Sequence, residues 1–146
     1  MDLGKASLGD DKALAYALLR VTLGLNIFMH GLSRILAGPA VFAGTLDKMF
    51  QETILAGWPV HVFGLALPWF EAAVGLLLLL GLGTRVALTG GALLIVLLTF
   101  GTALRQDWAI AGIQLNYAAI YAALLAFLHW DRYSLDAMLS RNRKEE

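Results

Sequence analysis

Four polar or ionisable side chains lie within one strongly apolar stretch, residues 18–35, which reads LLRVTLGLNIFMHGLSRI. They are Arg20, Asn26, His30 and Arg34. At about 100° per residue, all four fall within roughly one third of the circumference of a helix, and the remainder is apolar. An ionisable side chain at this depth in a membrane is costly unless it faces other helices, and such side chains often mark the path of a ligand, a proton or a charge. We therefore expect the stripe to face the interior of a helix bundle.

A carboxylate, Glu71, lies near the middle of a later apolar stretch, about residues 60–82, which includes LPWFEAAVGLLLLLGLG. Arg20 is its natural partner, because two opposite charges in hydrocarbon offset much of each other's desolvation cost. A purely structural ion pair, which fixes the helix register and binds nothing, explains the same two residues equally well. His30 adds a proton-exchanging group on the face that carries Arg20. Together these residues predict a polar cavity within the membrane.

Hydrogen-bonding side chains on the last apolar stretch complete the candidate site. Gln114, Tyr117 and Tyr121 share one helical face there, although aromatic side chains at this spacing also serve ordinary packing. A quinone head group suits such a cavity, because its carbonyls need donors, its reduction needs protons and its tail can leave between helices into lipid. The residues predicted to act in catalysis are His30, Glu71 and Arg20, and those predicted to bind the cofactor are Asn26, Gln114, Tyr117 and Tyr121.

The composition indicates a membrane protein. Of 146 residues, 59% are hydrophobic and 15% charged, with a mean hydropathy of +0.70, which is more apolar surface than a soluble domain can hide. Each span needs about 20 residues, so the chain has room for about four. We expect one all-α domain, an integral membrane four-helix bundle of up-down-up-down topology.

Breaks in the apolar pattern give the expected boundaries. The helices are predicted at about residues 13–36, 60–82, 86–104 and 110–130, followed by a loose or amphipathic tail over residues 131–146. Asp10 and Asp11 are placed to cap the first helix, and Gly38-Pro39 ends it. Within residues 39–58, apolar positions recur every three or four residues, which predicts a short helix on the membrane surface, with an irregular connector as the alternative. No signal-peptide layout precedes the first helix, so we expect it to be retained.

Several kinds of chemistry lack support in this sequence. Cys is absent, which excludes disulfides, thiolate nucleophiles and Cys-ligated iron–sulfur clusters. The three His residues are too scattered to form a metal site, and 11 basic residues against 11 acidic ones give no basic surface for nucleic acid. A chain without a redox centre of its own would take electrons from a partner protein.

Basic residues beside the spans predict the orientation. With four spans, one side would carry Lys5, Lys12, Arg85, Arg132, Arg141, Arg143 and Lys144, and the other would carry Arg34, Lys48 and Arg105. Because the side richer in Lys and Arg usually faces the cytoplasm, we expect both termini to be cytoplasmic and the short surface helix to be outside.

Three separated segments resemble the DoxX family of small four-helix membrane proteins. They are LLRVTLGLNIFMHGLSRI in the first helix, FEAAVGLLLLLGLGTR across the second helix and its turn, and RYSLDAML after the fourth. They occur in the family's order and bracket most of the chain. The resemblance implies a four-helix membrane fold and gives weight to Arg20, His30, Gly31, Glu71 and Arg85.

The same resemblance carries an expectation about function. Some members resemble the membrane subunit of a thiosulfate:quinone oxidoreductase and others are grouped with membrane redox complexes, which implies a prokaryotic plasma (inner) membrane, quinone and a redox partner. This chain departs from the family in two places: Gln114 stands where relatives often have a carboxylate, and His129-Trp130-Asp131 replaces a Gly-Pro-Gly exit. If that carboxylate handles protons in relatives, Gln114 cannot.

Two function classes remain open. The first is a membrane subunit of a redox complex that interacts with quinone or quinol, in contact with lipid and a redox partner protein. The second is a non-catalytic membrane anchor or assembly subunit, whose buried polar stripe holds the bundle or a partner helix. Association with a second copy of the chain stays open in both classes.

Overall fold

Helices make up almost all of the described chain. The computed structural model describes residues 3–145, with side chains described for residues 9–142. The elements are α1 (Leu3–Ala37), α2 (Pro39–Phe50), α3 (Trp58–Leu80), α4 (Thr84–Leu104), α5 (Trp108–Ala126), the 3-10 helix η1 (Leu128–Trp130) and α6 (Leu135–Glu145). Residues 3–145 include no strand, so the all-α prediction is confirmed.

Four helices are long and apolar enough to cross a membrane. They cover Gly9–Ala37, Trp58–Leu80, Thr84–Leu104 and Trp108–Ala126, close to the four predicted spans. The chain is therefore a membrane protein with four candidate spans. The side that each end faces stays a prediction, and three cations used in that prediction (Lys5, Arg143 and Lys144) lie outside the described side chains.

The start of α1 differs from the prediction, whereas its end agrees with it. α1 begins at Leu3, so Asp10 and Asp11 lie inside the helix and do not cap it. No proline and no turn-forming pair interrupts residues 3–12, and the helix simply continues through them. At its other end the Gly-Pro pair acts as predicted, because Gly38 adopts φ 101° and α2 begins directly at Pro39. The tail forms a helix, α6, after the short η1.

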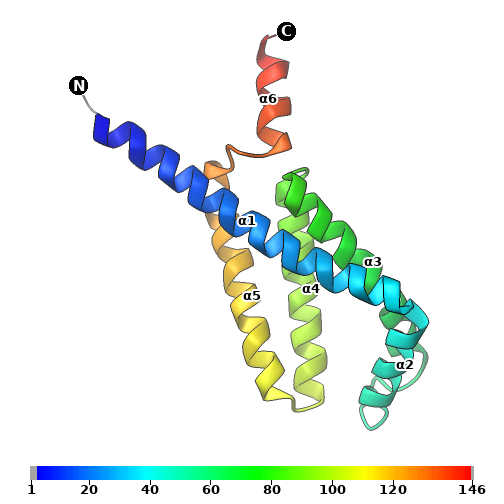
Figure 1. Ribbon diagram of the computed structural model, residues 1–146. Helices are drawn as coiled ribbons and strands as arrows, with labels where there is room; N and C mark the ends of the chain where they lie inside the picture. Colours follow the sequence, from blue (N-terminus) through cyan, green and yellow to red (C-terminus); the bar gives the residue numbers. More distant parts are fainter. Residues whose placement is uncertain (1–2, 146) are drawn as a thin grey trace.

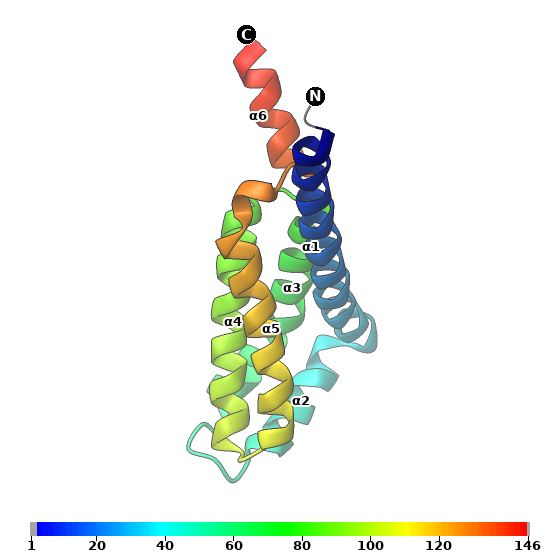
Figure 2. The same cartoon turned by 90° about the vertical axis from the view of Figure 1, so that its left-hand side faces the viewer.

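The helices pack mainly in two pairs. Figures 1 and 2 show α1 lying along α3, and α4 lying along α5. α2 packs beside α3 at one end of the bundle, whereas the start of α1 and the whole of α6 lie at the opposite end. With 35 residues, α1 is about 52 Å long, which exceeds a hydrocarbon core of about 30 Å. Its oblique course across the bundle in Figure 1 fits this excess length.

Glycines let the backbones of α1 and α3 approach closely. A Cβ on Gly31 would collide with the backbone of Ala72, and a Cβ on Gly75 would collide with the backbone of Phe28. Small residues serve this purpose at membrane helix contacts, where dispersion between close backbones replaces the hydrophobic effect. This contact fixes how α1 presents its polar side chains to the bundle.

We expect Gly75→Ala to destabilise the detergent-solubilised protein by about 1 to 3 kcal/mol, because the added methyl forces two backbones apart. The control is Gly112→Ala, where nothing lies within 4 Å of the new Cβ and the gain in helix propensity should stabilise slightly. Thermal unfolding followed by circular dichroism measures both. Shifts of the same sign and size would contradict the close packing.

Candidate functional site

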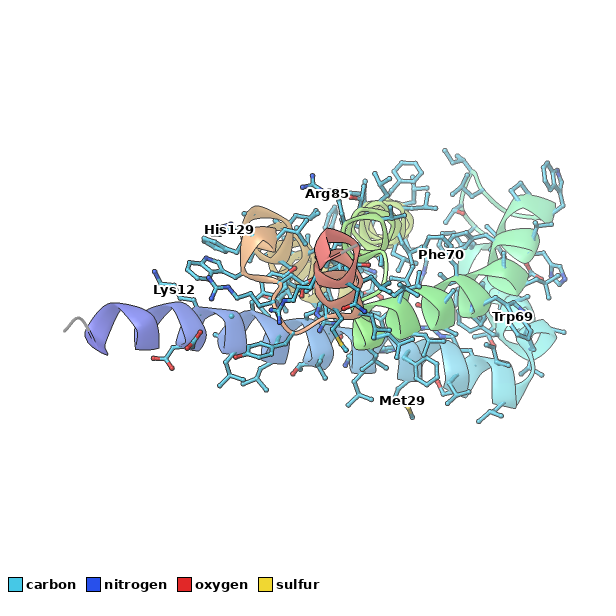
Figure 3. The ribbon with its side chains drawn as sticks, turned by 90° about the horizontal axis from the view of Figure 1, so that it is seen from above. Lys12, Met29, Trp69, Phe70, Arg85 and His129 are labelled. Carbon is cyan, nitrogen blue, oxygen red and sulfur yellow. The ribbon has the colours of Figure 1, made fainter. Side chains whose placement is uncertain are left out.

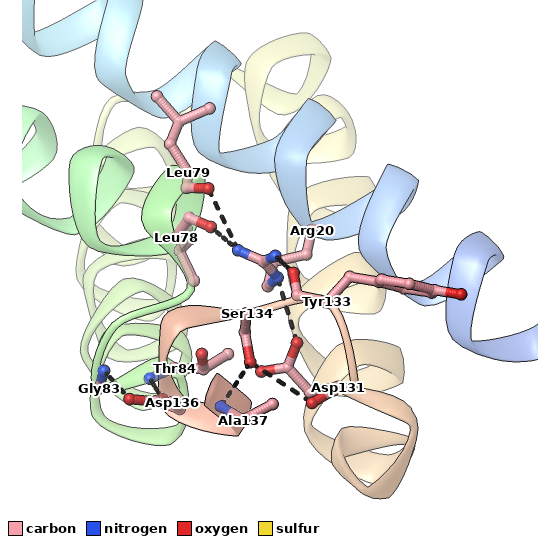
Figure 4. Close-up of polar contacts among 10 residues, drawn as sticks. All are labelled: Arg20, Leu78, Leu79, Gly83, Thr84, Asp131, Tyr133, Ser134, Asp136 and Ala137. Atoms are coloured by element: carbon pink, nitrogen blue, oxygen red, sulfur yellow. Dashed lines mark hydrogen bonds and ion pairs between the residues drawn. The ribbon is translucent and has the colours of Figure 1, made fainter. Parts of the chain in front are cut away.

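Arg20 is buried at the end of the bundle where α3 finishes, with 2% of its surface exposed. Its Nη1 donates to the carbonyls of Leu78 and Leu79, the latter at 3.3 Å, and its Nη2 donates to the carbonyl of Tyr133 at 2.7 Å. Its Nε lies 3.4 Å from a carboxylate oxygen of Asp131 (Figure 4). The guanidinium therefore satisfies the carbonyl end of α3 and anchors the segment that follows η1. We call Arg20 and these partners the Arg20 cluster.

The predicted pairing of Arg20 with Glu71 is wrong. Glu71, which is 4% exposed, pairs with Arg34. A helical wheel gives the direction of a side chain but not the depth at which it meets another helix. Arg20 and Arg34 share a face, yet 14 residues separate them by about 21 Å along the axis, so they reach different levels of α3.

The turn between α3 and α4 belongs to the same end of the bundle. Gly81 adopts φ 64° and contacts Ser134 so closely that a Cβ would collide with it. Asp136 caps α4 by accepting from the backbone N–H groups of Gly83 and Thr84 at 2.9 and 2.8 Å (Figure 4). Burial alone would raise the pKa of the Asp136 carboxyl, but these two N–H groups hold it below its ordinary value.

Three separated sequence segments thus meet in one place. The arginine of the first stretch, the Gly-Leu-Gly-Thr-Arg turn and the Tyr-Ser-Leu-Asp segment lie in contact through Arg20, Gly81, Ser134 and Asp136. Their hydrogen bonds satisfy the last carbonyls of α3 and the first N–H groups of α4, and hold the segment after η1 against the bundle. The three segments therefore have a structural role in holding this end of the bundle together. Arg20 lies apart from the other residues predicted to act in catalysis, His30 and Glu71.

The polar stripe of α1 is only partly turned inward. Arg20 is buried, whereas Asn26 and His30 are exposed. Asn26 accepts a hydrogen bond of 2.9 Å from the hydroxyl of Tyr117 on α5. His30 lies one helical turn before Arg34, the partner of Glu71. The polar stripe therefore lies at the border between the face of α1 that packs on α3 and the exposed face of α1.

A cavity of about 460 Å³ lies beneath α2, between that helix and α3, α4 and α5. Phenylalanines supply much of its wall, and among them Phe42 and Phe50 come from α2. α2 is held to α3 by a 2.7 Å contact between Asp47 and the Nδ1 atom of His61. The sequence predicts a cavity under this segment between the first, second and fourth spans; the observed cavity is also lined by the third span, α4.

Two arginines, Arg34 and Arg105, are the cationic residues in the lining of this cavity. Arg34 stacks over the Phe42 ring at 4.5 Å while it holds Glu71, and Arg105 lies 5.4 Å from the centre of the Phe50 ring. Both guanidinium groups line the cavity. They are therefore placed to attract an electron-rich or anionic group beneath the aromatic side chains of α2.

Gln114 is the one predicted cofactor ligand that lines this cavity. Its Oε1 accepts a hydrogen bond of 2.8 Å from the hydroxyl of Thr102 on α4. Within the described part of the chain, this leaves the amide nitrogen of Gln114 available as a donor to a ligand. Thr102 itself was missed in the sequence, although it is one of few polar residues in an apolar span and could have been found on that ground.

Tyr121 lies elsewhere in the core. It is 1% exposed, and its ring packs directly against Gly91 of α4. Tyr117 contacts Asn26, as described above, and does not line the cavity. The structure therefore brings Gln114 and Arg34 to the wall of this cavity, with Glu71 joined to it through its ion pair with Arg34, and separates Arg20, Tyr117 and Tyr121 from it. The roles predicted for these residues in catalysis and binding stay predictions.

Comparison with known proteins gives a family and nothing beyond it. A family model described as DoxX matches residues 15–105, which is more than half of the chain. No curated protein and no solved structure matches. Among the described residues, no group of three or more His, Cys, Asp and Glu side chains is placed to hold a metal ion.

Proposed function

Because this chain belongs to the DoxX family, a family of membrane proteins, we propose that it is a membrane subunit of a redox complex and binds a quinone or quinol in the cavity beneath α2. The observation that carries the proposal is the hydrogen-bonded pair of Thr102 and Gln114, set in a wall that is otherwise largely aromatic and aliphatic. A quinone needs both features, since its ring packs on apolar surface and its carbonyl oxygens accept hydrogen bonds.

In this proposal, different residues of the cavity contact different parts of the quinone. The amide of Gln114 donates to one carbonyl of the ring, and the phenylalanines of α2 cover the ring face. Arg34 and Arg105 favour the electron-rich reduced form over the oxidised form. Reduction to quinol takes two electrons and two protons. The electrons come from a partner protein, which this chain would anchor in the membrane.

Proton exchange in this proposal depends on Glu71 and His30. Glu71 is joined to the cavity wall by its ion pair with Arg34, and His30 lies one turn before Arg34 in an exposed position on α1. A proton can therefore move from the exposed imidazole towards the pair that borders the cavity. Arg20 takes no part, because its donors are used within the Arg20 cluster.

The proposal includes a location. It places the chain in a prokaryotic plasma (inner) membrane with both termini cytoplasmic, as the excess of basic residues on that side favours. The cavity beneath α2 then lies in the outer half of the membrane. Lipid surrounds the bundle, and a second copy of the chain or the redox partner covers part of α1.

A non-catalytic anchor is the second candidate. The observation in its favour is that the buried charges have partners, since Arg34 holds Glu71 and Arg20 lies against Asp131. Charges that compensate each other can fix helix register without binding any ligand. On this alternative the cavity holds lipid, and the chain serves only to attach or assemble other subunits.

Quinone extracted from the purified protein distinguishes the two candidates. We expect close to one quinone per chain after purification in mild detergent, and a loss of most of it in Gln114→Leu, because that change removes the donor and keeps the volume of the side chain similar. The matched control is Asn116→Leu on the same helix, which is exposed and hydrogen-bonds only to the carbonyl of Gly112 among the described residues.

Equal quinone content in the Gln114→Leu and Asn116→Leu proteins would exclude this cavity as the binding site. If the parent protein retains no quinone and added quinone analogues do not raise its melting temperature, the anchor becomes the better description. Circular dichroism spectra of all three proteins must agree for the comparison to hold.

A further inference from the structure

A second groove lies at the other end of the molecule, between the start of α1 and the end of α5. Its volume is about 370 Å³, and its lining includes Lys12, Tyr16, Leu19, Ala123, Phe127 and Trp130. Leu19 and Phe127 are 38% and 55% exposed, so the groove opens towards the surroundings of the bundle. No step of the proposed function uses it.

Positive charge gathers at one end of this groove. The ammonium of Lys12 lies 5.2 Å from the centre of the Trp130 ring, and the guanidinium of Arg132 lies 5.4 Å from the same centre. Figure 3 shows Lys12 on the side of α1 that faces η1, where His129 is labelled. Asp10 approaches Arg132 at 3.6 Å, but both side chains are at least half exposed, and such pairs contribute little and exchange readily.

The rest of the groove is apolar and lies deeper in the membrane. Lys12 is near the start of the first candidate span, and Trp130 follows the end of the fourth. Leu19 and Ala123 lie within those spans. The groove therefore runs from the level of the lipid headgroups, where tryptophan is favoured, into the hydrocarbon. Its charged end and its apolar end match the two ends of a lipid molecule.

We propose that this groove binds one phospholipid with an anionic headgroup, taken from the surrounding bilayer. The phosphate lies at Lys12 and Arg132, and one acyl chain follows the apolar surface between α1 and α5. Charge complementarity at the mouth selects an anionic over a zwitterionic lipid. The bound lipid fills a gap between two helices that otherwise contact each other little at this end. The proposal does not rest on quinone binding, because the two cavities share no residue.

Native mass spectrometry of the full chain, delipidated and then titrated with phosphatidylglycerol or phosphatidylcholine, tests this site. We expect the parent protein to bind one phosphatidylglycerol more tightly than any phosphatidylcholine. Ala123→Leu fills the groove and should weaken phosphatidylglycerol binding about tenfold. Its matched control, Ala122→Leu, changes the neighbouring exposed position, which does not line the groove, and should leave binding unchanged.

Lys12→Gln tests the charge and should weaken phosphatidylglycerol binding roughly fivefold without affecting phosphatidylcholine. Arg85→Gln removes an exposed cation at the same end of the bundle, outside the groove, and should have no effect. Lys12 is itself exposed, so this variant remains informative if Ala123→Leu does not fold. Equal affinity for both lipids in the parent, or equal affinity in the Ala123→Leu and Ala122→Leu proteins, would overturn the proposal.

Discussion

Replacing Arg20 with glutamine is expected to lower the free energy of unfolding by about 3 to 5 kcal/mol, enough to prevent stable folding in many detergents. The change leaves the Asp131 carboxylate buried without its cation, and it removes donors from the carbonyls of Leu78 and Tyr133. Thermal or denaturant unfolding in a mild detergent measures the loss. Activity is not needed for this test, because the expected effect is on the fold.

A second variant separates this explanation from a general effect of altering an arginine. Asp131→Asn in the Arg20→Gln background should cost less than it does in the wild-type chain, since the two side chains lie 3.4 Å apart and are coupled. Arg85→Gln is the matched single variant and should change stability by less than about 0.5 kcal/mol, because Arg85 is exposed. A small effect of Arg20→Gln would mean that the cluster does not hold the bundle.

Glu71→Gln is expected to destabilise the protein by about 3 kcal/mol, because it leaves Arg34 without its partner beside the cavity. The value lies at the lower end of the usual range, since Arg34 is 27% exposed and water can reach it. In an Arg34→Gln background the further loss should be smaller by at least about 1 kcal/mol.

The control for this double-mutant cycle replaces Arg20, the arginine that does not pair with Glu71. In an Arg20→Lys background, Glu71→Gln should cost as much as it does alone, because Arg20 belongs to a different cluster at a different level of α3. Coupling of Glu71 to Arg20 in place of Arg34 would reject the arrangement described above. Unfolding midpoints of the three single and two double variants decide between the two pairings.

The sequence predicts the helices well because their signals are local. Runs of apolar residues give the four spans, and the Gly38-Pro39 pair gives the boundary between α1 and α2, since proline cannot continue a helix and glycine adopts positive φ. The start of α1 was predicted too late, because acidic residues such as Asp10 can cap a helix or lie inside one. Only the structure distinguishes the two.

Partners of buried charges were harder to predict, because they depend on where separate helices cross. Arg20 lies on the expected inward face, but Asp131, its partner, follows the last span and carries no signal that ties it to α1. Arg34 was recognised as part of the stripe, yet not as the partner of Glu71. Close contacts such as that at Gly75 set the tilt of α1 against α3, and this tilt decides at what depth along α3 each arginine of α1 lies.

The Arg20 cluster also bears on how the chain is made. α1, which carries Arg20, leaves the ribosome before the segment with Tyr133, whose carbonyl Arg20 binds and which comes 113 residues later. Until that segment is synthesised, the cation of Arg20 remains in α1 without its full set of acceptors, and an unpaired Arg within a membrane span is costly. Final closure of this end of the bundle therefore waits until Tyr133 has been synthesised, and a nascent chain stalled after α5 would present an incompletely assembled α1 to membrane chaperones and proteases.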